Sequence, residues 1–435
     1  MKKVFLSILA ISLLAKVNAQ ETVYPAPPQT GTVVITNATV HVGNGQVLNN
    51  ANITITNGKI AAVGTGAVPT GAKTIDATGK HVYPGLILPV SNLGLVDINS
   101  IRAGNDVREI GDWNPNVRAL AAYNTDSKVI NTLRSSGVLL ANIAPQGSFL
   151  AGSSSVVQLD AWNWEDAAYK TDAGFHFYMP SLLPLPQFGG FGASQGQAQG
   201  DNVKLGLEKI ERLKTFFREA KAYNGLQQTE ETNLRFGAVK GLFDKSKKLY
   251  VHANTVKQML VAMDFVNEFG FDVVIVGGAD SWQIPDLLKK NNVSVVLNQP
   301  HSLPMLGDDD VDQPYKTAAM LQKAGVLFSI NDDDAQTRGR NLSYNAGTAA
   351  AYGLDKEEAL KAITLNAAKI LGVSDRTGSI EVGKDANIII STGDILDMRT
   401  SNVTDAFIQG RKIDLTDKQK QLNERYNRKY GTKEF

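Results

Sequence analysis

The sequence predicts an α/β protein in which a TIM-like (β/α)8 barrel is joined to a small β-sandwich domain built from both chain ends. Three observations lead to this prediction. Apolar, strand-like segments alternate with helical patterns over residues 82–330, short β-branched segments precede that region, and two further strand-like segments follow it. Such alternation is typical of parallel strands joined by crossover helices, and eight such strands indicate a closed barrel.

The start of the chain has the pattern of an export signal. Two lysines precede an apolar run over residues 4–14, and residues 17–19 (Val-Asn-Ala) suit cleavage by signal peptidase. This pattern is that of a secretory signal peptide and not of a membrane-spanning helix. We therefore expect residues 1–19 to be removed, residues 20–31 to form a proline-rich extended leader, and the mature protein to be periplasmic or secreted.

The composition restricts the partners that the protein can have. Its 44 basic and 43 acidic residues give a formal net charge of +1, and no long basic run is present. This balance argues against nucleic acid or an anionic membrane as the main partner. The chain has no cysteine, so neither a disulfide nor a lipidated cysteine can form. We expect no nucleic-acid binding and no membrane anchor.

The region after the leader is predicted to form a small antiparallel sheet. Its short β-branched segments are residues 32–36, 39–42, 51–56 and 59–63. Asn57-Gly58 lies between the last two segments and is the strongest hairpin signal in the chain. Residues 386–391 and 406–408 are predicted as late strands that rejoin this sheet.

These patterns give a division of the mature chain into domains. The expected division is a small β domain over residues 32–81 and 376–414, a barrel over residues 82–375, and a charged tail over residues 415–435. The tail is expected to be an exposed helix that frays.

The barrel is predicted to open with the apolar run over residues 82–90, which contains Pro84-Gly85 and suits a strand buried on both faces. The other predicted strands are residues 138–143, 155–159, 175–179, 249–253, 272–276, 293–297 and 326–330. The predicted helices are residues 117–134, 203–223, 255–269, 284–290, 315–323, 341–352, 356–363 and 366–371. Residues 180–200 are glycine-rich, and two interpretations stay open with equal weight: a lid, or an insertion without a role.

Four separated stretches carry a family resemblance. They are residues 75–87 (IDATGKHVYPGLI), residues 251–254 (VHAN), residues 324–330 (AGVLFSI) and a long signature over residues 341–387 that includes TLNAAKILG and GSIEVGKDAN. Together they resemble the amidohydrolase superfamily, specifically its imidazolonepropionase-like and prolidase-like exported branch. The resemblance implies a barrel whose first strand ends in D-x-H-x-H, with further histidines after strands five and six and an aspartate after strand eight.

In that family these side chains hold one or two divalent metals, which activate a water for attack on an amide carbonyl. Most of the implied ligands are replaced in this chain. The aspartate position holds Leu88, the two histidine positions hold Val90 and Asn92, and the position after strand six holds Gly277. His252 stands where the strand-five histidine is expected. Zinc or another divalent metal is therefore implied by the resemblance only, and we expect weak or absent binding.

The remaining candidate residues follow predicted strands. Asp333, or Asp332 beside it, stands where the acid after strand eight is expected, and with His252 it is the candidate catalytic and metal-ligating pair. His252 is also interpreted as a hydrogen-bonded pocket residue without a catalytic role, and this interpretation is favoured two to one. Asn92, Asp280 and His301 are candidate pocket residues, with His301 more readily a loop residue than a ligand.

Two functions of different classes follow. The first is an exported hydrolase that acts on C–N bonds of cyclic amides or proline-containing dipeptides, with an impaired metal site. The second is a non-catalytic binding or scaffold protein that pairs with an active paralogue, and the ligand count favours this second function for the isolated chain. The expected partners are a small amide or peptide-like ligand, a second copy of the chain, or such a paralogue.

Overall fold

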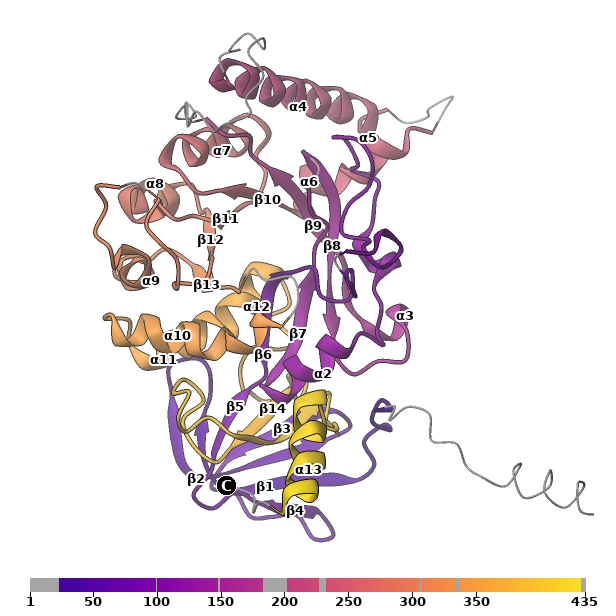
Figure 1. Ribbon diagram of the computed structural model, residues 1–435, viewed down its shortest axis with the longest axis vertical. Coiled ribbons are helices and arrows are strands. Elements are labelled where there is room, and N and C mark those ends of the chain that lie inside the picture. The colour runs from indigo at the N-terminus through magenta and orange to yellow at the C-terminus, as the bar shows by residue number, and fades with distance from the viewer. Residues whose placement is uncertain are drawn as a thin grey trace, which may run out of the picture.

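The computed structural model describes residues 23–98, 100–147, 149–182, 202–226, 232–305, 307–332 and 337–431. Figure 1 shows a β-rich part at the bottom, the barrel above it, and helix α4 (Asn202–Asn224) across the top. The predicted signal peptide, most of residues 180–200 and Asp333 lie outside the described residues. In the described ranges, no helix combines the length and the apolar character needed to cross a membrane.

The small sheet draws its strands from both ends of the chain. Its strands are β1 (Thr32–His41), β2 (Val47–Thr56), β3 (Lys59–Gly64), β4 (Lys73–Asp76), β5 (His81–Pro84), β14 (Ile388–Ser391), β15 (Val403–Ile408) and β16 (Arg411–Lys412). Their order is β16-β15-β14-β5-β1-β2-β3, and β4 pairs with the first half of β1. The late strands therefore rejoin the N-terminal sheet. The sheet is mixed and not purely antiparallel, because β1 runs parallel to both β4 and β5.

The predicted hairpin at Asn57-Gly58 is confirmed. Strands β2 and β3 pair up to Thr56 and Lys59, which leaves a two-residue turn. Asn57 and Gly58 have φ angles of 51° and 78°, the left-handed values that such turns require. A Cβ atom at position 58 would also lie 2.9 Å from the backbone oxygen of Gln409, so glycine is needed for space as well as for conformation.

The barrel sheet contains eight strands, as predicted. They are β6 (Leu86–Ser91), β7 (Val138–Ile143), β8 (Leu150–Gln158), β9 (Ala168–Tyr178), β10 (Lys248–Ala253), β11 (Val273–Gly277), β12 (Ser294–Leu297) and β13 (Phe328–Ile330), each bonded to the next. The expectation of wholly parallel strands is wrong for β8, which is antiparallel to β7 and β9. Residues 144–149 between β7 and β8 are too few for a crossover helix.

The opening apolar run is divided between the two sheets. The division falls at Gly85: β5 pairs with β1 and β14 in the small sheet, and β6 pairs with β7 in the barrel. Every residue of β6 is buried, which agrees with the prediction of a strand covered on both faces. A Cβ atom at Gly85 would lie 2.5 Å from Leu139, so the chain passes between the two sheets where only glycine fits.

Helices cover the outside of the barrel sheet. They are α2 (Lys128–Ser135), α3 (Trp164–Ala167), α4, α5 (Leu234–Ala238), α6 (Lys240–Phe243), α7 (Val256–Phe269), α8 (Pro285–Lys290), α9 (Gln313–Ala324), α10 (Leu342–Ala351), α11 (Lys356–Ala362) and α12 (Leu365–Leu371). Four 3-10 turns, Arg102–Gly104, Ala119–Ala122, Ser281–Gln283 and Arg338–Asn341, join them. The helix expected over residues 117–134 is wrong in its first half, where Arg118 bridges to Ser153 and only a short 3-10 turn follows.

The barrel is nearly closed at a seam between its first and last strands. No ladder joins β6 to β13, but the side-chain oxygen of Asn331 accepts a hydrogen bond of 3.2 Å from the backbone nitrogen of Val90. Helix α12 lies against both β6 and β13 and covers the seam. The structure therefore confirms the TIM-like barrel with a β-rich domain.

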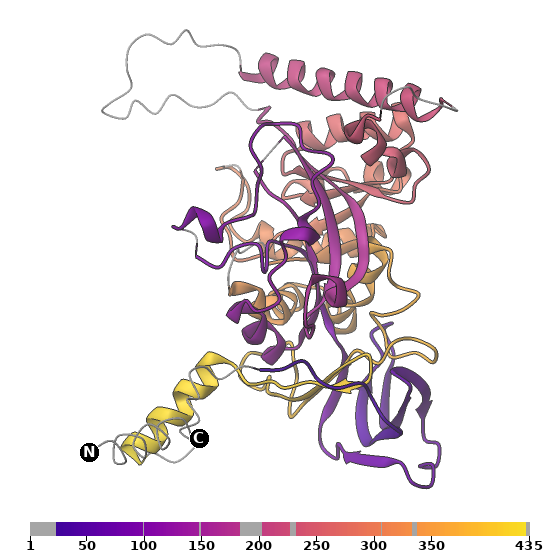
Figure 2. The ribbon, with the colours of Figure 1, turned by 90° about the vertical axis from the view of Figure 1, so that its right-hand side faces the viewer.

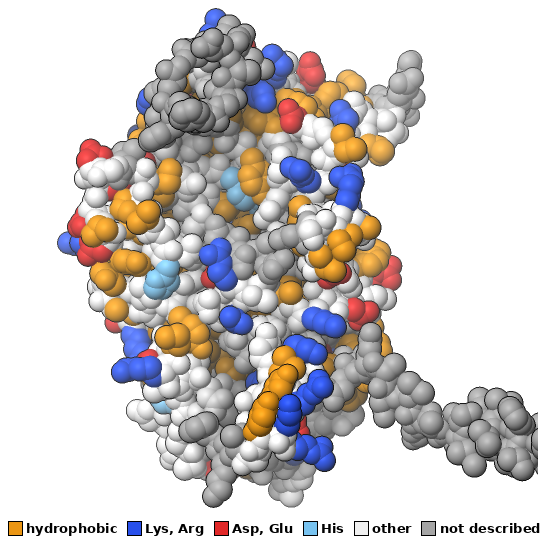
Figure 3. Space-filling model, in the orientation of Figure 1, with side chains coloured by type: hydrophobic (Ala, Val, Ile, Leu, Met, Phe, Trp, Pro, Cys, Tyr) orange, Lys and Arg blue, Asp and Glu red, His pale blue; other side chains and the backbone are white. Residues whose placement is uncertain are grey.

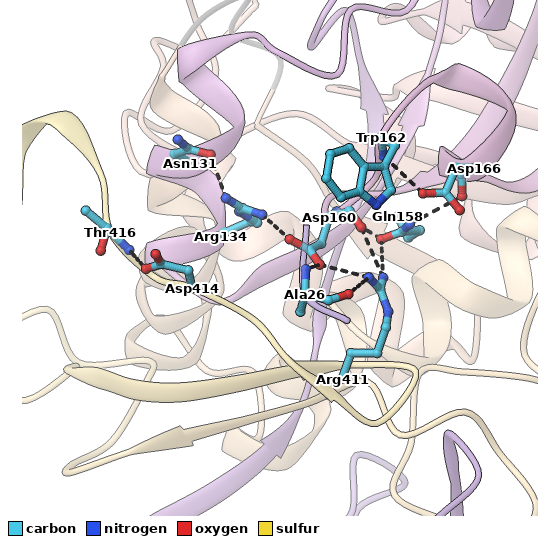
Figure 4. Close-up of polar contacts among 10 residues, drawn as sticks. All are labelled: Ala26, Asn131, Arg134, Gln158, Asp160, Trp162, Asp166, Arg411, Asp414 and Thr416. Carbon is cyan, nitrogen blue, oxygen red and sulfur yellow. Dashed lines mark hydrogen bonds and ion pairs between the residues drawn. The ribbon is translucent and has the colours of Figure 1, made fainter. Parts of the chain in front are cut away.

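A buried charge cluster ties the leader, the barrel and the small sheet together (Figure 4). Asp160 follows β8, and its carboxylate accepts hydrogen bonds from Arg134 of α2, from Arg411 of β16 at 3.0 Å and from the backbone nitrogen of Ala26 at 2.9 Å. The Asp160 side chain is fully buried. Helix α13 (Lys418–Tyr430) follows in the tail; it has no buried residue and projects to one side in Figure 2.

Candidate ligand-binding site

A cavity of about 390 Å³ lies at the carboxyl ends of the barrel strands. This is the end at which enzymes of this architecture place their chemistry. Eight of the lining residues are polar or aromatic, and three are aliphatic or contain sulfur. The polar or aromatic ones are Ser91, Gln146, Tyr178, His252, Asn254, Gln258, Asn298 and Asn331, and the others are Val90, Met179 and Val276. Most of these residues lie in β6, β9, β10 and β11 or directly follow β9, β10, β12 and β13; Gln146 lies in the loop after β7, and Gln258 lies in α7.

His252 lies in this cavity and is held from two sides. Its Nε2 atom lies 2.9 Å from Nδ1 of His176, which is on the adjacent strand β9 and is fully buried. Its ring stacks on Tyr178 with centroids 3.8 Å apart, and the ring of His176 stacks on Tyr250 at 4.8 Å. The parallel register of β9 and β10 produces both stacks, because Tyr178 is paired with His252 and His176 with Tyr250.

Burial keeps this histidine pair uncharged. It lowers the pKa of His252 to about 3, and it lowers the pKa of His176 well below its ordinary value, with His252 itself contributing. Burial also raises the pKa of Tyr178 and of Tyr250. At neutral pH all four rings are therefore neutral, and the two histidines share a single hydrogen bond.

Carboxamide side chains supply most of the other polar groups of the cavity. Some of them have structural roles: Gln258 caps α7 by accepting from the backbone nitrogens of Asn254 and Thr255, and it donates to the backbone oxygen of Pro180. Asn331 closes the barrel seam through its oxygen, while its buried Nδ2 has no protein partner in the described part of the chain. The cavity is thus polar without a charged group among the described residues that line it.

The positions expected to hold metal ligands are occupied by residues that bind metal poorly or not at all. At one of them, Gly277, a larger side chain would also lack space. Leu88 is packed in the barrel core, and Val90 lines the cavity with its isopropyl group. Asn92 is 3% exposed, and its Oδ1 has no protein partner among the described residues. Gly277 has a φ of 103°, and a Cβ atom there would clash with the Asn254 side chain, so no histidine fits without rearrangement.

Asp280 lies outside the cavity that contains His252. It is buried and lines an adjoining cavity of about 200 Å³, and Asn254 and Asn298 line both cavities. Its carboxylate accepts a hydrogen bond of 3.4 Å from the backbone nitrogen of Val256 at the start of α7. Burial raises the pKa of this carboxyl group above its ordinary value.

Asp332 and His301 line a third cavity, of about 830 Å³, between α10 and the segment that follows β14. Asp332 is 3% exposed and accepts a hydrogen bond of 3.1 Å from Asn345. His301 is exposed, and its Nε2 atom lies 3.0 Å from the hydroxyl of Thr348. His301, Asp280 and Asp332 therefore line other cavities than the one that contains His252. The preferred acid, Asp333, lies outside the described residues.

These residues do not fit the metal that the family resemblance implies. A zinc site needs at least three protein ligands, and the described residues contain no group of three histidines, cysteines or carboxylates arranged to hold a metal ion. The one histidine at an expected position has its Nε2 hydrogen-bonded to another ring. His176 is not among the candidate residues of the sequence analysis. The pattern that could have identified it is its place two residues before Tyr178, on the same face of β9.

The face of the molecule in Figure 3 has no single charge character. On the face in Figure 3, lysine and arginine side chains are interspersed with acidic and hydrophobic ones over the barrel, and basic side chains gather over α13 at the lower right. Helix α13 carries Arg428 and Lys429 in its last turn.

Comparisons with known proteins agree on one family. A family model described as "Amidohydrolase family" matches residues 227–413. An imidazolonepropionase from Flavobacterium psychrophilum is 27% identical over 230 residues, which cover 48% of this chain and 50% of that protein. An imidazolonepropionase from Thermoplasma volcanium is 38% identical over 82 residues, which cover 18% of this chain and 20% of that protein. The chain thus spans half or less of the length of these curated relatives.

One solved structure resembles the whole fold. An amidohydrolase from Thermotoga maritima superposes with a TM-score of 0.75 at 26% identity, covering 88% of this chain and 99% of that one. The likeness therefore extends over most of the chain.

Proposed function

Because this chain belongs to the amidohydrolase superfamily, we propose that it is an exported member that binds a small ligand at the barrel mouth without metal-dependent hydrolysis. The observation that carries this proposal is the state of the metal-ligand positions. Leu88, Val90 and Gly277 have no side-chain atom that can bind a metal, and the Nε2 atom of His252 is hydrogen-bonded to His176. A cavity of about 390 Å³ remains at the same place.

The loss of ligands and the retention of a cavity have different physical consequences. With fewer than three protein ligands, a divalent cation has no closed site and does not supply an activated water. A concave, largely pre-formed cavity with a few placed polar groups is nevertheless what small-molecule recognition needs. Binding by this barrel therefore does not depend on the chemistry that its relatives' names describe.

A second candidate is an impaired C–N hydrolase that retains part of the family reaction. The observation that favours it is Asp332, a carboxylate that is buried at the end of β13 beside Asn345. In this proposal the acid after the last strand and His252 would act with a metal bound by fewer or different ligands. The two candidates differ in metal content, which makes them separable by one measurement.

The deciding experiment measures metal in the mature protein purified without chelator and without a histidine tag. The expected result is much less than one zinc, manganese or iron per chain by mass spectrometry, with no hydrolysis of acyl-proline dipeptides when zinc or manganese is added. A stoichiometric metal that disappears in His252→Gln but persists in His301→Gln would overturn the binding proposal and support the hydrolase. His301→Gln is the matched control because it removes an exposed histidine from a different cavity.

Export and partnership are further parts of the proposal. The lysines, apolar run and small residues before Gln20 support cleavage there, which N-terminal sequencing of the periplasmic and secreted fractions would test. For a scaffold role we propose pairing with an active paralogue or with a second copy of this chain. Light scattering of the chain alone, and of the chain co-expressed with such a paralogue, measures both.

A further inference from the structure

The histidine pair in the barrel has one buried nitrogen without a partner. Nδ1 of His176 lies 2.9 Å from Nε2 of His252, and the other ring nitrogen of His176, Nε2, is buried with no hydrogen-bond partner among the described residues. A neutral imidazole carries one N–H donor and one acceptor nitrogen, and which nitrogen holds the proton follows from the hydrogen bonds available to each.

Only two arrangements of the protons are compatible with two neutral rings sharing one hydrogen bond. If His252 donated, the proton of His176 would be on its Nε2, and a buried N–H group would have no acceptor. If His176 donates from Nδ1, its Nε2 is an acceptor nitrogen and the proton of His252 is on Nδ1. Buried N–H groups without an acceptor are rarer than acceptors without a donor, so the second arrangement is favoured.

We infer that His176 is a positioning residue that fixes His252 as the Nδ1–H tautomer, so that the cavity offers a hydrogen-bond donor and selects an uncharged ligand with an acceptor oxygen. The inference rests on the proposed function, since it names the class of ligand for the same cavity. The stacks of Tyr178 on His252 and of Tyr250 on His176 hold both ring planes, which fixes the direction of the donor as well as its identity.

The lining of the cavity sets the charge of the ligand. Among the described residues around it, the polar side chains are carboxamides, a serine hydroxyl, a tyrosine and the neutral His252. A carboxylate or an ammonium group that entered would lose its hydration without meeting an opposite charge, which is costly. An amide, in contrast, can donate to and accept from carboxamides while its carbonyl oxygen accepts from His252.

The tautomer can be measured directly. The chain has five histidines, so ¹⁵N-histidine labelling gives a spectrum simple enough to assign with His301→Gln and His81→Gln variants. The expected result at neutral pH is a protonated-type ¹⁵N shift at Nδ1 of both His252 and His176 and an unprotonated-type shift at both Nε2 atoms. A protonated Nε2 on His252 would overturn the inference.

Two substitutions of His176 test its positioning role. In His176→Asn the carboxamide still offers a donor toward Nε2 of His252, whereas in His176→Leu no donor remains. The expected result is that His252 keeps a single Nδ1–H tautomer in the Asn variant and becomes a mixture of tautomers in the Leu variant. A single unchanged tautomer in the Leu variant would show that His176 does not position the ring, and the spectrum of the unsubstituted protein stands as evidence if either variant fails to fold.

The ligand class is tested with two probes that differ in one group, N-acetyl-L-prolinamide and N-acetyl-L-proline. By calorimetry on protein treated with chelator, the neutral probe is expected to bind at least tenfold more tightly than the carboxylate, and His252→Phe, which removes the N–H donor, is expected to weaken binding of the neutral probe. Equal or tighter binding of the carboxylate, or binding of neither probe at millimolar concentration, would overturn the ligand class. Because the protein is metal-free in this assay, either result is independent of the metal content on which the proposed function depends.

Discussion

Replacement of Asp160 by asparagine should destabilise the protein strongly without changing its shape. Asp160 is fully buried and accepts hydrogen bonds from Arg134, from Arg411 and from the backbone of Ala26. The asparagine side chain has nearly the same volume but carries no charge, and its amide nitrogen would face a guanidinium group. Arg134 and Arg411 would then both lose the carboxylate that pairs with them, although their side chains are only 4% and 14% exposed.

The size of the loss follows from burial. Breaking a buried ion pair by removing one partner costs about 3 to 5 kcal/mol, because the remaining charge stays desolvated. An unfolding entropy of about 2.1 cal/mol/K per residue gives roughly 0.8 kcal/mol/K for a chain of roughly 400 residues. The expected decrease in the melting temperature is therefore about 4 to 6 °C.

Scanning calorimetry of the mature protein measures this decrease. The matched control is Glu268→Gln, which removes the carboxylate of an ion pair with Arg218. The side chain of Arg218 is 47% exposed and that of Glu268 is 33% exposed. An exposed pair contributes about 1 kcal/mol or less, so the control should shift the melting temperature by about 1 °C at most. Equal shifts in the two variants would refute the reasoning that burial decides the cost.

Three further predictions concern the barrel mouth. Gly277→His should lower the melting temperature and bind no zinc, because its left-handed backbone and the Asn254 side chain leave no space for a Cβ atom. Asn331→Ala should lower the free energy of unfolding in urea by about 1 to 3 kcal/mol, because a buried backbone N–H across the seam loses its acceptor. Stability should fall as the pH drops from about 6.5, because burial holds the pKa values of His176 and His252 below that of the unfolded chain and the unfolded chain therefore binds protons first.

Each of these predictions has an outcome that contradicts it. A zinc-loaded Gly277→His protein of unchanged stability would mean that the loop after β11 adapts readily. An unchanged free energy of unfolding in Asn331→Ala would mean that the acceptor at the seam does not stabilise the barrel. For the pH dependence, the free energy of unfolding is measured in urea between about pH 7 and pH 5. It should change by up to about 1.4 kcal/mol per pH unit for each histidine, and the change should become smaller in His176→Asn. An unchanged profile in that variant would contradict the assignment.

The sequence predicted the fold well because the barrel strands are short, apolar and bounded by turn residues. Val138–Ile143 was predicted with its bounds, and the Asn57-Gly58 hairpin was predicted with its turn. The direction of β8 was not predictable from periodicity, because an antiparallel and a parallel buried strand have the same apolar pattern. The loop between β7 and β8 is too short for a crossover helix, and this short length is what indicates an antiparallel pair.

The candidate site was predictable only at the level of strand ends. His252 was expected at the mouth and lies there, but His301 and Asp280 also follow strands and line other cavities. The reason is that a loop residue's direction depends on the path of the loop after the strand and not on its place in the sequence. His176 could not be recognised as the partner of His252 without the register that joins β9 to β10.

The division of the opening strand at Gly85 has a consequence for the order of folding. Strand β5 lies between β1 and β14, and β14 begins at Ile388, about three hundred residues after β5 along the chain. During synthesis, β5 therefore has an unpaired edge until nearly all of the barrel has been made. Unpaired strand edges promote aggregation, and contacts between distant segments form slowly. A nascent chain of this protein should therefore need protection of that edge, and β6, its direct continuation, should be able to join the barrel before β5 has found its last neighbour.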